Sequence, residues 1–168
     1  MQHDTKSIDN VTIAAIQMCS TSDKEQNYAT CERLIRTAVS NISLNSPVKL
    51  VCLPECFFFI GESLTQSMNA AETLTDSNII MRFCNLAKEL EVWLSLGGFQ
   101  ERGYYRVPTS THDEQASDAT PDDPPAESTA GQPAEQPHER ITNAHIVISP
   151  EGKLDPSHIY RKVSRQST

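Results

Sequence analysis

The stretch KLVCLPECFFFIG, residues 49–61, places one carboxylate, Glu55, directly after an apolar run that reads as a buried strand. Reactive groups collect at the carboxyl ends of strands in open α/β sheets. A carboxylate held there in a partly dry pocket becomes a better base, because desolvation disfavours its charged form. Glu55 is therefore a candidate general base. The alternative is that Glu55 caps the following turn or pairs with a surface base.

Lys162 is the second candidate, at the end of the short strand-like run HIYRK, residues 158–162. A lysine at the end of a strand can stabilise a developing oxyanion with a fixed positive charge. The alternative is that Lys162 forms a solvated basic pair with its neighbour Arg161.

The sequence contains five cysteines, and most of them lie within apolar patterns: Cys19, Cys31, Cys52, Cys56 and Cys84. This is typical of reduced, buried thiols in a cytosolic compartment. A zinc site built from Cys52, Cys56 and Cys84 with His145 is the alternative, but the paired C-x-x-C spacing of such sites is missing. We therefore expect no metal.

Two further motifs have structural and functional interpretations. The glycines of LGGF, residues 96–99, lack a phosphate-binding pattern and indicate a tight turn or close backbone packing. The aromatic run Phe57–Phe59 suits a hydrophobic core or the wall of a substrate pocket.

These residues need a scaffold, and the hydrophobic pattern predicts alternating strands and helices. Ser22 and Glu25 fit a capping box at the start of the first helix. The glycines are expected to stop the third strand, and SPEG is expected to form the turn of a later hairpin. The predicted elements are strand 11–18, helix 22–42, strand 48–54, helix 76–91, strand 92–99, hairpin 141–154 and strand 158–162. This order predicts an α/β fold with a parallel central sheet.

Acidic charge is concentrated in one segment, residues 108–139, which holds eight acidic residues, no Lys or Arg, and no large apolar side chain. The whole chain carries 22 acidic and 14 basic residues, a net charge of −8, so the remainder is neutral. The segment cannot bury enough apolar area to offset its ordering, and we expect it to be disordered. The charge argues against nucleic acid, and no apolar run has the length of a membrane span. The N-terminus lacks a secretory signal, so we expect a cytoplasmic protein.

Three motifs occur in order between residues 11 and 162: LPECFFFIG, WLSLGGFQERG, and ITNAHIVISPEGKL followed by YRK. Together they resemble the nitrilase, or carbon–nitrogen hydrolase, superfamily, and within it the Nit-type deaminated glutathione amidases. In some animals that domain is fused to a fragile-histidine-triad domain. The resemblance implies the N-terminal portion of an α-β-β-α sandwich. It divides the chain into a flexible N-terminus (1–10), a first hydrolase part (11–103), an acidic Pro-rich insert (104–139), a continued hydrolase part (140–162) and a divergent tail (163–168).

The superfamily uses a Glu–Lys–Cys triad, and the resemblance places two of its members on this sequence. Glu55 matches the glutamate of the LPE motif, a general base and acid. Lys162 matches the lysine of the YRK motif, which stabilises the oxyanion. The nucleophilic cysteine of the family follows that lysine on a further strand, and neither Cys52 nor Cys56 resembles its position. The resemblance therefore implies that the nucleophile is absent from this chain and that the fold is interrupted before its strand.

The resemblance implies hydrolysis of an amide C–N bond in a small carboxylate metabolite, with deaminated glutathione as the candidate substrate. No cofactor is needed, and the family form can assemble as a homo-oligomer. Without the cysteine, we expect this chain alone to be inactive. The alternative is a non-catalytic remnant or interaction module that associates with a full-length subunit.

Overall fold

The computed structural model describes residues 10–41, 46–105 and 138–162, which form three helices and five strands. The strands are β1 (Thr12–Ala15), β2 (Val48–Leu53), β3 (Trp93–Tyr105), β4 (His138–Ile148) and β5 (Leu154–Lys162). The helices are α1 (Lys24–Val39), α2 (Leu64–Ala70) and α3 (Asn78–Leu90). The chain divides into two compact units, and the second comprises Tyr104–Arg140. Of that unit the structure describes only the end of β3 and the start of β4.

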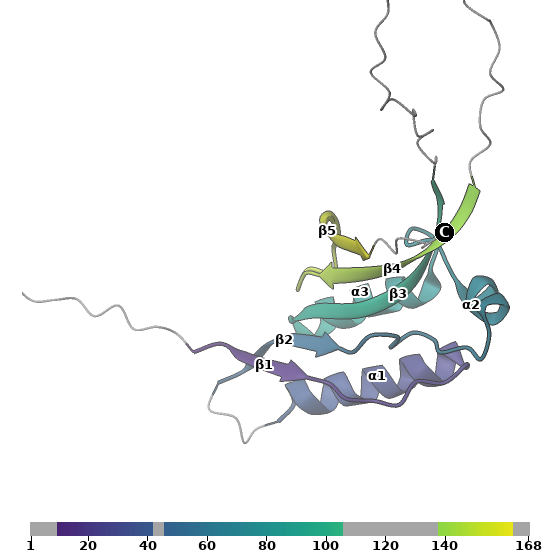
Figure 1. The fold of residues 1–168 in the computed structure, drawn as a ribbon. Coiled ribbons are helices and arrows are strands. Elements are labelled where there is room, and N and C mark those ends of the chain that lie inside the picture. Colours follow the sequence, from purple (N-terminus) through teal and green to yellow (C-terminus); the bar gives the residue numbers. More distant parts are fainter. Residues whose placement is uncertain (1–9, 42–45, 106–137, 163–168) are drawn as a thin grey trace, which may run out of the picture. The chain divides into compact units, whose positions relative to one another are not determined.

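One five-stranded sheet forms the centre of the first unit, in the order β1-β2-β3-β4-β5 (Figure 1). β1 pairs parallel with β2, and β2 pairs parallel with β3, as the sequence predicts. Helices connect these strands, because a parallel pair requires a crossover connection. β4 and β5 form the expected antiparallel hairpin, in which the Gly152 amide donates to the Ser149 carbonyl across the SPEG turn at 2.8 Å.

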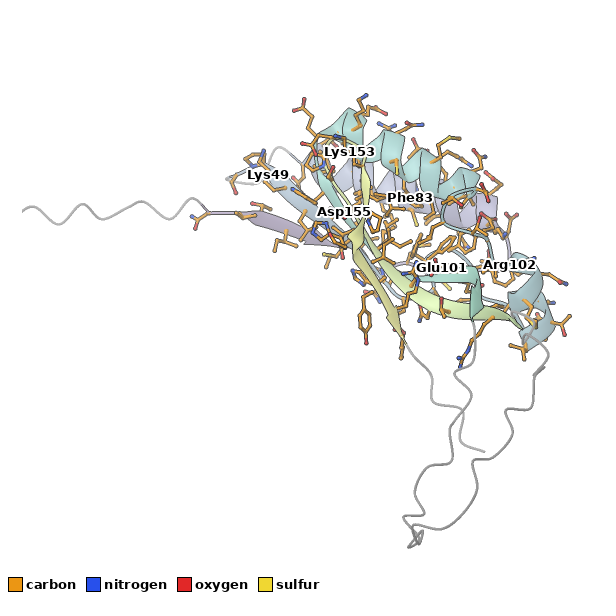
Figure 2. All side chains as sticks on the ribbon, turned by 90° about the horizontal axis from the view of Figure 1, so that it is seen from above. Lys49, Phe83, Glu101, Arg102, Lys153 and Asp155 are labelled. Carbon is orange, nitrogen blue, oxygen red and sulfur yellow. The ribbon has the colours of Figure 1, made fainter. Side chains whose placement is uncertain are left out.

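Helices α1 and α3 cover one face of the sheet, and Phe83 of α3 lies on that covered side (Figure 2). Its ring is fully buried and contacts Tyr28 and Phe57 edge-to-face, with centroids 4.9 and 5.6 Å apart. Burial of such aromatic side chains is the main contribution to the stability of this core. The sheet contributes alternate residues to this core: Val51, Leu53, Leu94, Leu96, Ala144, Ile146 and Ile148.

The opposite face of the sheet, which we call the open face, has no helix over it in the described residues (Figure 1). Ile13, Leu50 and Trp93 are register partners across β1, β2 and β3 on this face, and Ile13 and Trp93 are 59% and 38% exposed. Tyr160 of β5 is 68% exposed. Among the helices that the structure describes, none combines the length and the apolar character that a membrane crossing requires.

Several boundaries differ from the prediction. Strand β1 covers only part of the predicted strand 11–18. The N-cap of α1 is Asp23, whose side chain accepts from the Gln26 amide, so the predicted Ser22–Glu25 capping box was wrong by one residue. β3 continues through both glycines instead of stopping there. The short helix α2 was not predicted, and HIYRK is the end of β5, not a separate strand.

Other predictions fall outside the described residues. The flexibility of residues 1–9, the helical assignment of Ile42, the disorder of residues 106–137 and the divergent tail 163–168 are not addressed by the structure. At the expected insert boundaries, Tyr104 and Tyr105 belong to β3, and His138 and Glu139 belong to β4.

Candidate active site

Glu55 lies on a turn that follows β2 after Pro54. The next residue, Cys56, has φ of 56°, a left-handed conformation that is unfavourable for a residue with a side chain. The Glu55 side chain is 70% exposed, so the described residues do not form the partly dry pocket that the sequence predicted. The turn does place the carboxylate at the carboxyl end of a parallel strand, where sites of α/β sheets form.

Gly97 and Gly98 let β3 approach this turn closely. A Cβ at Gly97 would lie 2.9 Å from the carbonyl oxygens of Leu53 and Pro54. A Cβ at Gly98 would lie 2.9 Å from the Cys56 amide nitrogen and 3.2 Å from the Glu55 Cα, and Gly98 also has a positive φ of 56°. The predicted close backbone packing at LGGF is therefore confirmed.

Lys162, the last residue of β5, lies close to the turn that carries Glu55. Its Cα is the register partner of Asn143 on β4, and its Nζ lies 3.9 Å from Glu55 Oε1. The Lys162 side chain is 63% exposed, so the pair contributes little to stability. The structure thus brings together the two site residues that the sequence singled out, a carboxylate and an ammonium that face the same solvent-accessible space.

Arg161 does not form the solvated basic pair with Lys162 that was considered as the alternative. Consecutive strand residues point to opposite faces, and the register partner of Arg161 is the fully buried Ala144. The Arg161 guanidinium instead donates to Glu101, from Nε at 2.5 Å and from Nη2 at 2.7 Å. Sequence reasoning missed Glu101, because nothing in the string ERG marks its glutamate as buried.

The five cysteines are free thiols, and three of them have a raised pKa. Burial raises the pKa of Cys31 to about 12. Burial, and then the charge of Glu55, raise the pKa of Cys56, and burial raises the pKa of Cys84. A raised pKa disfavours the thiolate, which is the nucleophilic form. In the part of the chain that the structure describes, His, Cys, Asp and Glu side chains form no group of three with metal-binding geometry.

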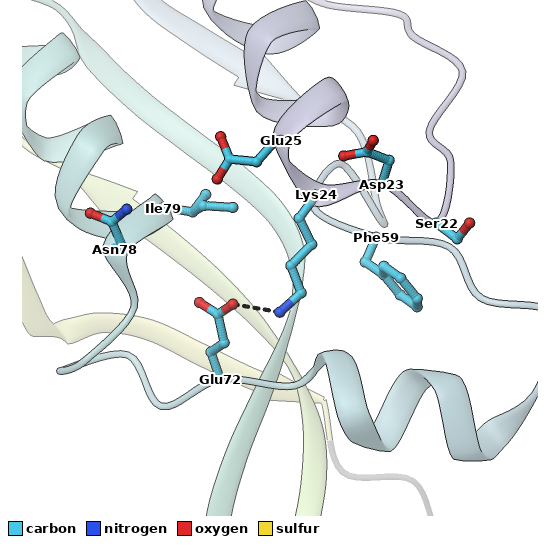
Figure 3. A pocket seen from close by; sticks show the side chains of 8 residues that line it. All are labelled: Ser22, Asp23, Lys24, Glu25, Phe59, Glu72, Asn78 and Ile79. Carbon is cyan, nitrogen blue, oxygen red and sulfur yellow. Dashed lines mark hydrogen bonds and ion pairs between the residues drawn. The ribbon is translucent and has the colours of Figure 1, made fainter.

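A cavity of about 540 Å³ lies elsewhere, beside the N-termini of α1 and α3 (Figure 3). Lys24 crosses it and pairs with Glu72 at 2.5 Å, and Glu72 also accepts from the Ser77 hydroxyl at 2.6 Å. Neither Glu55 nor Lys162 lines this cavity. Because Lys24 and Glu72 already pair with each other, we place the candidate site at the Glu55–Lys162 pair.

Comparison with known proteins shows the family of the chain. The chain belongs to the carbon–nitrogen hydrolase family, whose model matches residues 12–166. Among curated relatives, the deaminated glutathione amidase of Dictyostelium discoideum is 45% identical over 89 residues, which are 51% of this chain and 29% of that protein. The nitrilase and fragile histidine triad fusion protein NitFhit of Drosophila melanogaster is 30% identical over 154 residues, 92% of this chain and 24% of that protein.

The solved structures support the fold. The crystal structure of the Caenorhabditis elegans NitFhit protein matches with a TM-score of 0.58 at 24% identity, covering 91% of this chain and 28% of that one. The nitrilase-like α/β fold and the Nit-type relationship predicted from the motifs are thereby confirmed. The chain spans less than a third of the length of these relatives.

Proposed function

We propose that this chain supplies the glutamate and lysine of a Glu–Lys–Cys triad that hydrolyses the amide C–N bond of a small carboxylate metabolite. The single observation that carries the proposal is the approach of Lys162 Nζ to within 3.9 Å of Glu55 Oε1 at the carboxyl end of β2. The similarity to deaminated glutathione amidases supports deaminated glutathione as the substrate.

In the proposed mechanism, Glu55 takes the proton of a cysteine thiol, and the sulfur attacks the amide carbon. The carbonyl oxygen becomes an oxyanion, which the Lys162 ammonium stabilises. Glu55 then gives its proton to the leaving ammonia, and a thioester remains. Glu55 next takes a proton from water, and the hydroxide adds to the thioester carbon. The C–S bond then breaks, the acid departs, and Glu55 returns its proton to the sulfur, which restores the thiol.

The nucleophile in this proposal is a cysteine other than the five in this sequence. Cys56, the sequence neighbour of Glu55, has a pKa raised by burial and by the Glu55 charge. An attacking thiol needs the opposite shift. We therefore predict that the 168-residue chain releases no ammonia from deaminated glutathione above the rate without protein, because a triad without one member loses most of its activity. Measurable turnover that Cys56→Ser abolishes, with folding intact, would contradict the assignment.

A chimera tests the roles of Glu55 and Lys162 directly. Residues 12–162 would replace the matching segment of the Drosophila NitFhit protein, which this chain matches over 154 residues. We expect ammonia release from the chimera and a loss of roughly 10²–10⁴-fold in kcat/KM for Glu55→Gln and for Lys162→Met. Glu62→Gln and Lys153→Met, which alter exposed charges outside the site, are the controls. A folded, active chimera that tolerates Glu55→Gln would refute the proposal.

A second candidate function is favoured by the open sheet face. Val11, Ile13 and Tyr160 are 64%, 59% and 68% exposed, and large apolar patches on a protein surface mark interaction sites. The chain would then be a non-catalytic subunit that binds a longer carbon–nitrogen hydrolase through this face. Sedimentation of the chain with the Dictyostelium amidase tests this candidate, and two independent species would exclude it.

A further inference from the structure

We infer that Glu101 is a positioning residue for Lys162. Through Arg161 it fixes the end of β5, and thereby sets the distance between the Lys162 ammonium and the Glu55 carboxylate. The inference rests on the proposed function, because it takes those two groups as the working pair. Glu101 itself has no role in the proposed chemistry.

Glu101 is a buried carboxylate with a full set of partners. Only 7% of the residue is exposed. Its Oε2 accepts from Arg161 Nε at 2.5 Å and from Thr142 Oγ1 at 3.2 Å, and its Oε1 accepts from Arg161 Nη2 at 2.7 Å. Two parallel hydrogen bonds between a guanidinium and a carboxylate fix orientation as well as distance.

These contacts tie three strands together. Glu101 is on β3, Thr142 on β4 and Arg161 on β5. The backbone around Glu101 is itself fixed, because Glu72 bonds both of its neighbours: the Glu72 amide donates to the Gln100 carbonyl at 3.2 Å, and the Arg102 amide donates to the Glu72 carbonyl at 2.9 Å. Glu101 is therefore a hydrogen-bond partner of Arg161 whose own position is fixed.

The end of β5 needs such an anchor. Seven of its nine residues are exposed, and Lys162 is the last of them. Strand ends with few buried contacts open locally at little free-energy cost. Arg161 and Lys162 are adjacent and point to opposite faces, so holding Arg161 on the covered face orients Lys162 on the open face.

Strand β3 also fixes the other member of the pair. Gly98 packs against the backbone of Glu55 and Cys56, and Glu101 follows three residues further along the same strand. β3 therefore contacts the turn that carries Glu55 through Gly98, and it contacts the end of β5 through Glu101. Glu55 Oε1 and Lys162 Nζ lie 3.9 Å apart, and β3 helps to position both groups.

Zero-length crosslinking tests the inference on the 168-residue chain. A water-soluble carbodiimide activates a carboxylate, and an amine in contact with it forms an amide as the urea leaves. Mass spectrometry of the digested protein then reports the Glu55–Lys162 peptide pair. The Lys24–Glu72 pair, at 2.5 Å, serves as an internal reference for correct folding in every sample.

We expect Glu101→Gln to lower the Glu55–Lys162 crosslink by roughly fivefold or more relative to the Lys24–Glu72 crosslink, because proximity determines the yield. The variant keeps the size of the side chain but turns an amide NH₂ toward the guanidinium. The double variant Glu101→Leu with Arg161→Met removes both charges together, so it leaves no unpaired buried charge and avoids unfolding from that cause. We expect this double variant to lose the Glu55–Lys162 crosslink as well.

The outcomes separate the inference from the proposed function. If the wild-type chain gives the Lys24–Glu72 crosslink but not the Glu55–Lys162 crosslink, the catalytic pairing and the inference both fail. If the wild-type chain gives both crosslinks and both Glu101 variants retain them, only the inference fails. A purely structural role of Glu101 would lower both crosslinks in parallel, and that result would also overturn it.

Discussion

Gly98 is the residue at which a side chain would collide with the turn that carries Glu55. A Cβ there would lie 2.9 Å from both the Cys56 amide nitrogen and the Asn143 Oδ1, and the residue has a φ of +56°. We predict that Gly98→Ala lowers the free energy of unfolding by about 1–3 kcal/mol, from backbone strain and steric overlap. Urea denaturation measures this change. A change below about 0.5 kcal/mol would show that the turn moves freely away from β3.

The buried thiol of Cys31 provides a pH-dependent prediction. Burial raises its pKa from 9.0 to about 12 in the folded chain. The folded state therefore keeps its proton where the unfolded state loses it, and the stabilisation is complete below pH 9 and lost as the pH rises toward 12. The free energy of unfolding should fall by up to about 1.4 kcal/mol per pH unit in this range from Cys31.

The contribution of Cys31 can be isolated by comparison with Cys31→Ala, which is expected to be less stable at neutral pH but to have a flatter dependence above pH 9. Equal slopes for the two proteins would show that other groups cause the alkaline loss of stability.

At the residue scale, the sequence singled out Glu55 and Lys162, which the structure places 3.9 Å apart, and missed Glu101 for a physical reason. Glu55 and Lys162 lie at the ends of strands and within recognisable motifs. The local sequence pattern is therefore enough to predict their places in the fold. Glu101 pairs with Arg161, which lies 60 residues away in the sequence and reaches it across β4. Such a pairing depends on the register of β3, β4 and β5, and no local pattern encodes it.

Helix α1 shows how an element boundary depends on one side chain. Ser22 and Asp23 are both good N-cap residues, and the sequence favoured Ser22 because Glu25 follows at the right spacing. In the structure the Asp23 carboxylate accepts from the Gln26 amide at 3.0 Å. We predict that Asp23→Ala destabilises the protein by about 1 kcal/mol, while Ser22→Ala stays within about 0.5 kcal/mol. Thermal unfolding of the two variants decides between the caps, and a larger effect at Ser22 would restore the original interpretation.

The elements that the sequence predicted well are those with a strong apolar period, namely β2, α3 and the β4–β5 hairpin. β3 was expected to stop at its glycines, yet it continues to Tyr105 because the glycines serve close packing and do not end the strand. Pro156 lies within β5, which is tolerated because β5 is at the edge of the sheet. The seven-residue helix α2 is too short and polar for periodicity to reveal.

For the whole molecule, the main feature is the contrast between the two faces of the sheet. α1 and α3 bury one face, while the row of Ile13, Leu50 and Trp93 on the other face has no cover in the described residues. The motifs predicted an α-β-β-α sandwich, in which a second sheet packs against such a face. The matched segments make up 29% and 24% of the two relatives.

The open face predicts how the isolated chain behaves in solution. Each large apolar side chain left exposed forgoes roughly 1.5–3 kcal/mol, a large part of a domain's net stability of about 5–15 kcal/mol. We therefore expect the chain to bind a hydrophobic dye and to self-associate as its concentration rises. Ile13→Glu, on the open face, should reduce both effects, whereas Met81→Glu, on α3 with a similar exposure of 56% against 59%, should not. Dye fluorescence and sedimentation velocity measure the two effects. A monomer with a sharp cooperative melt and little dye binding would show that the open face needs no partner.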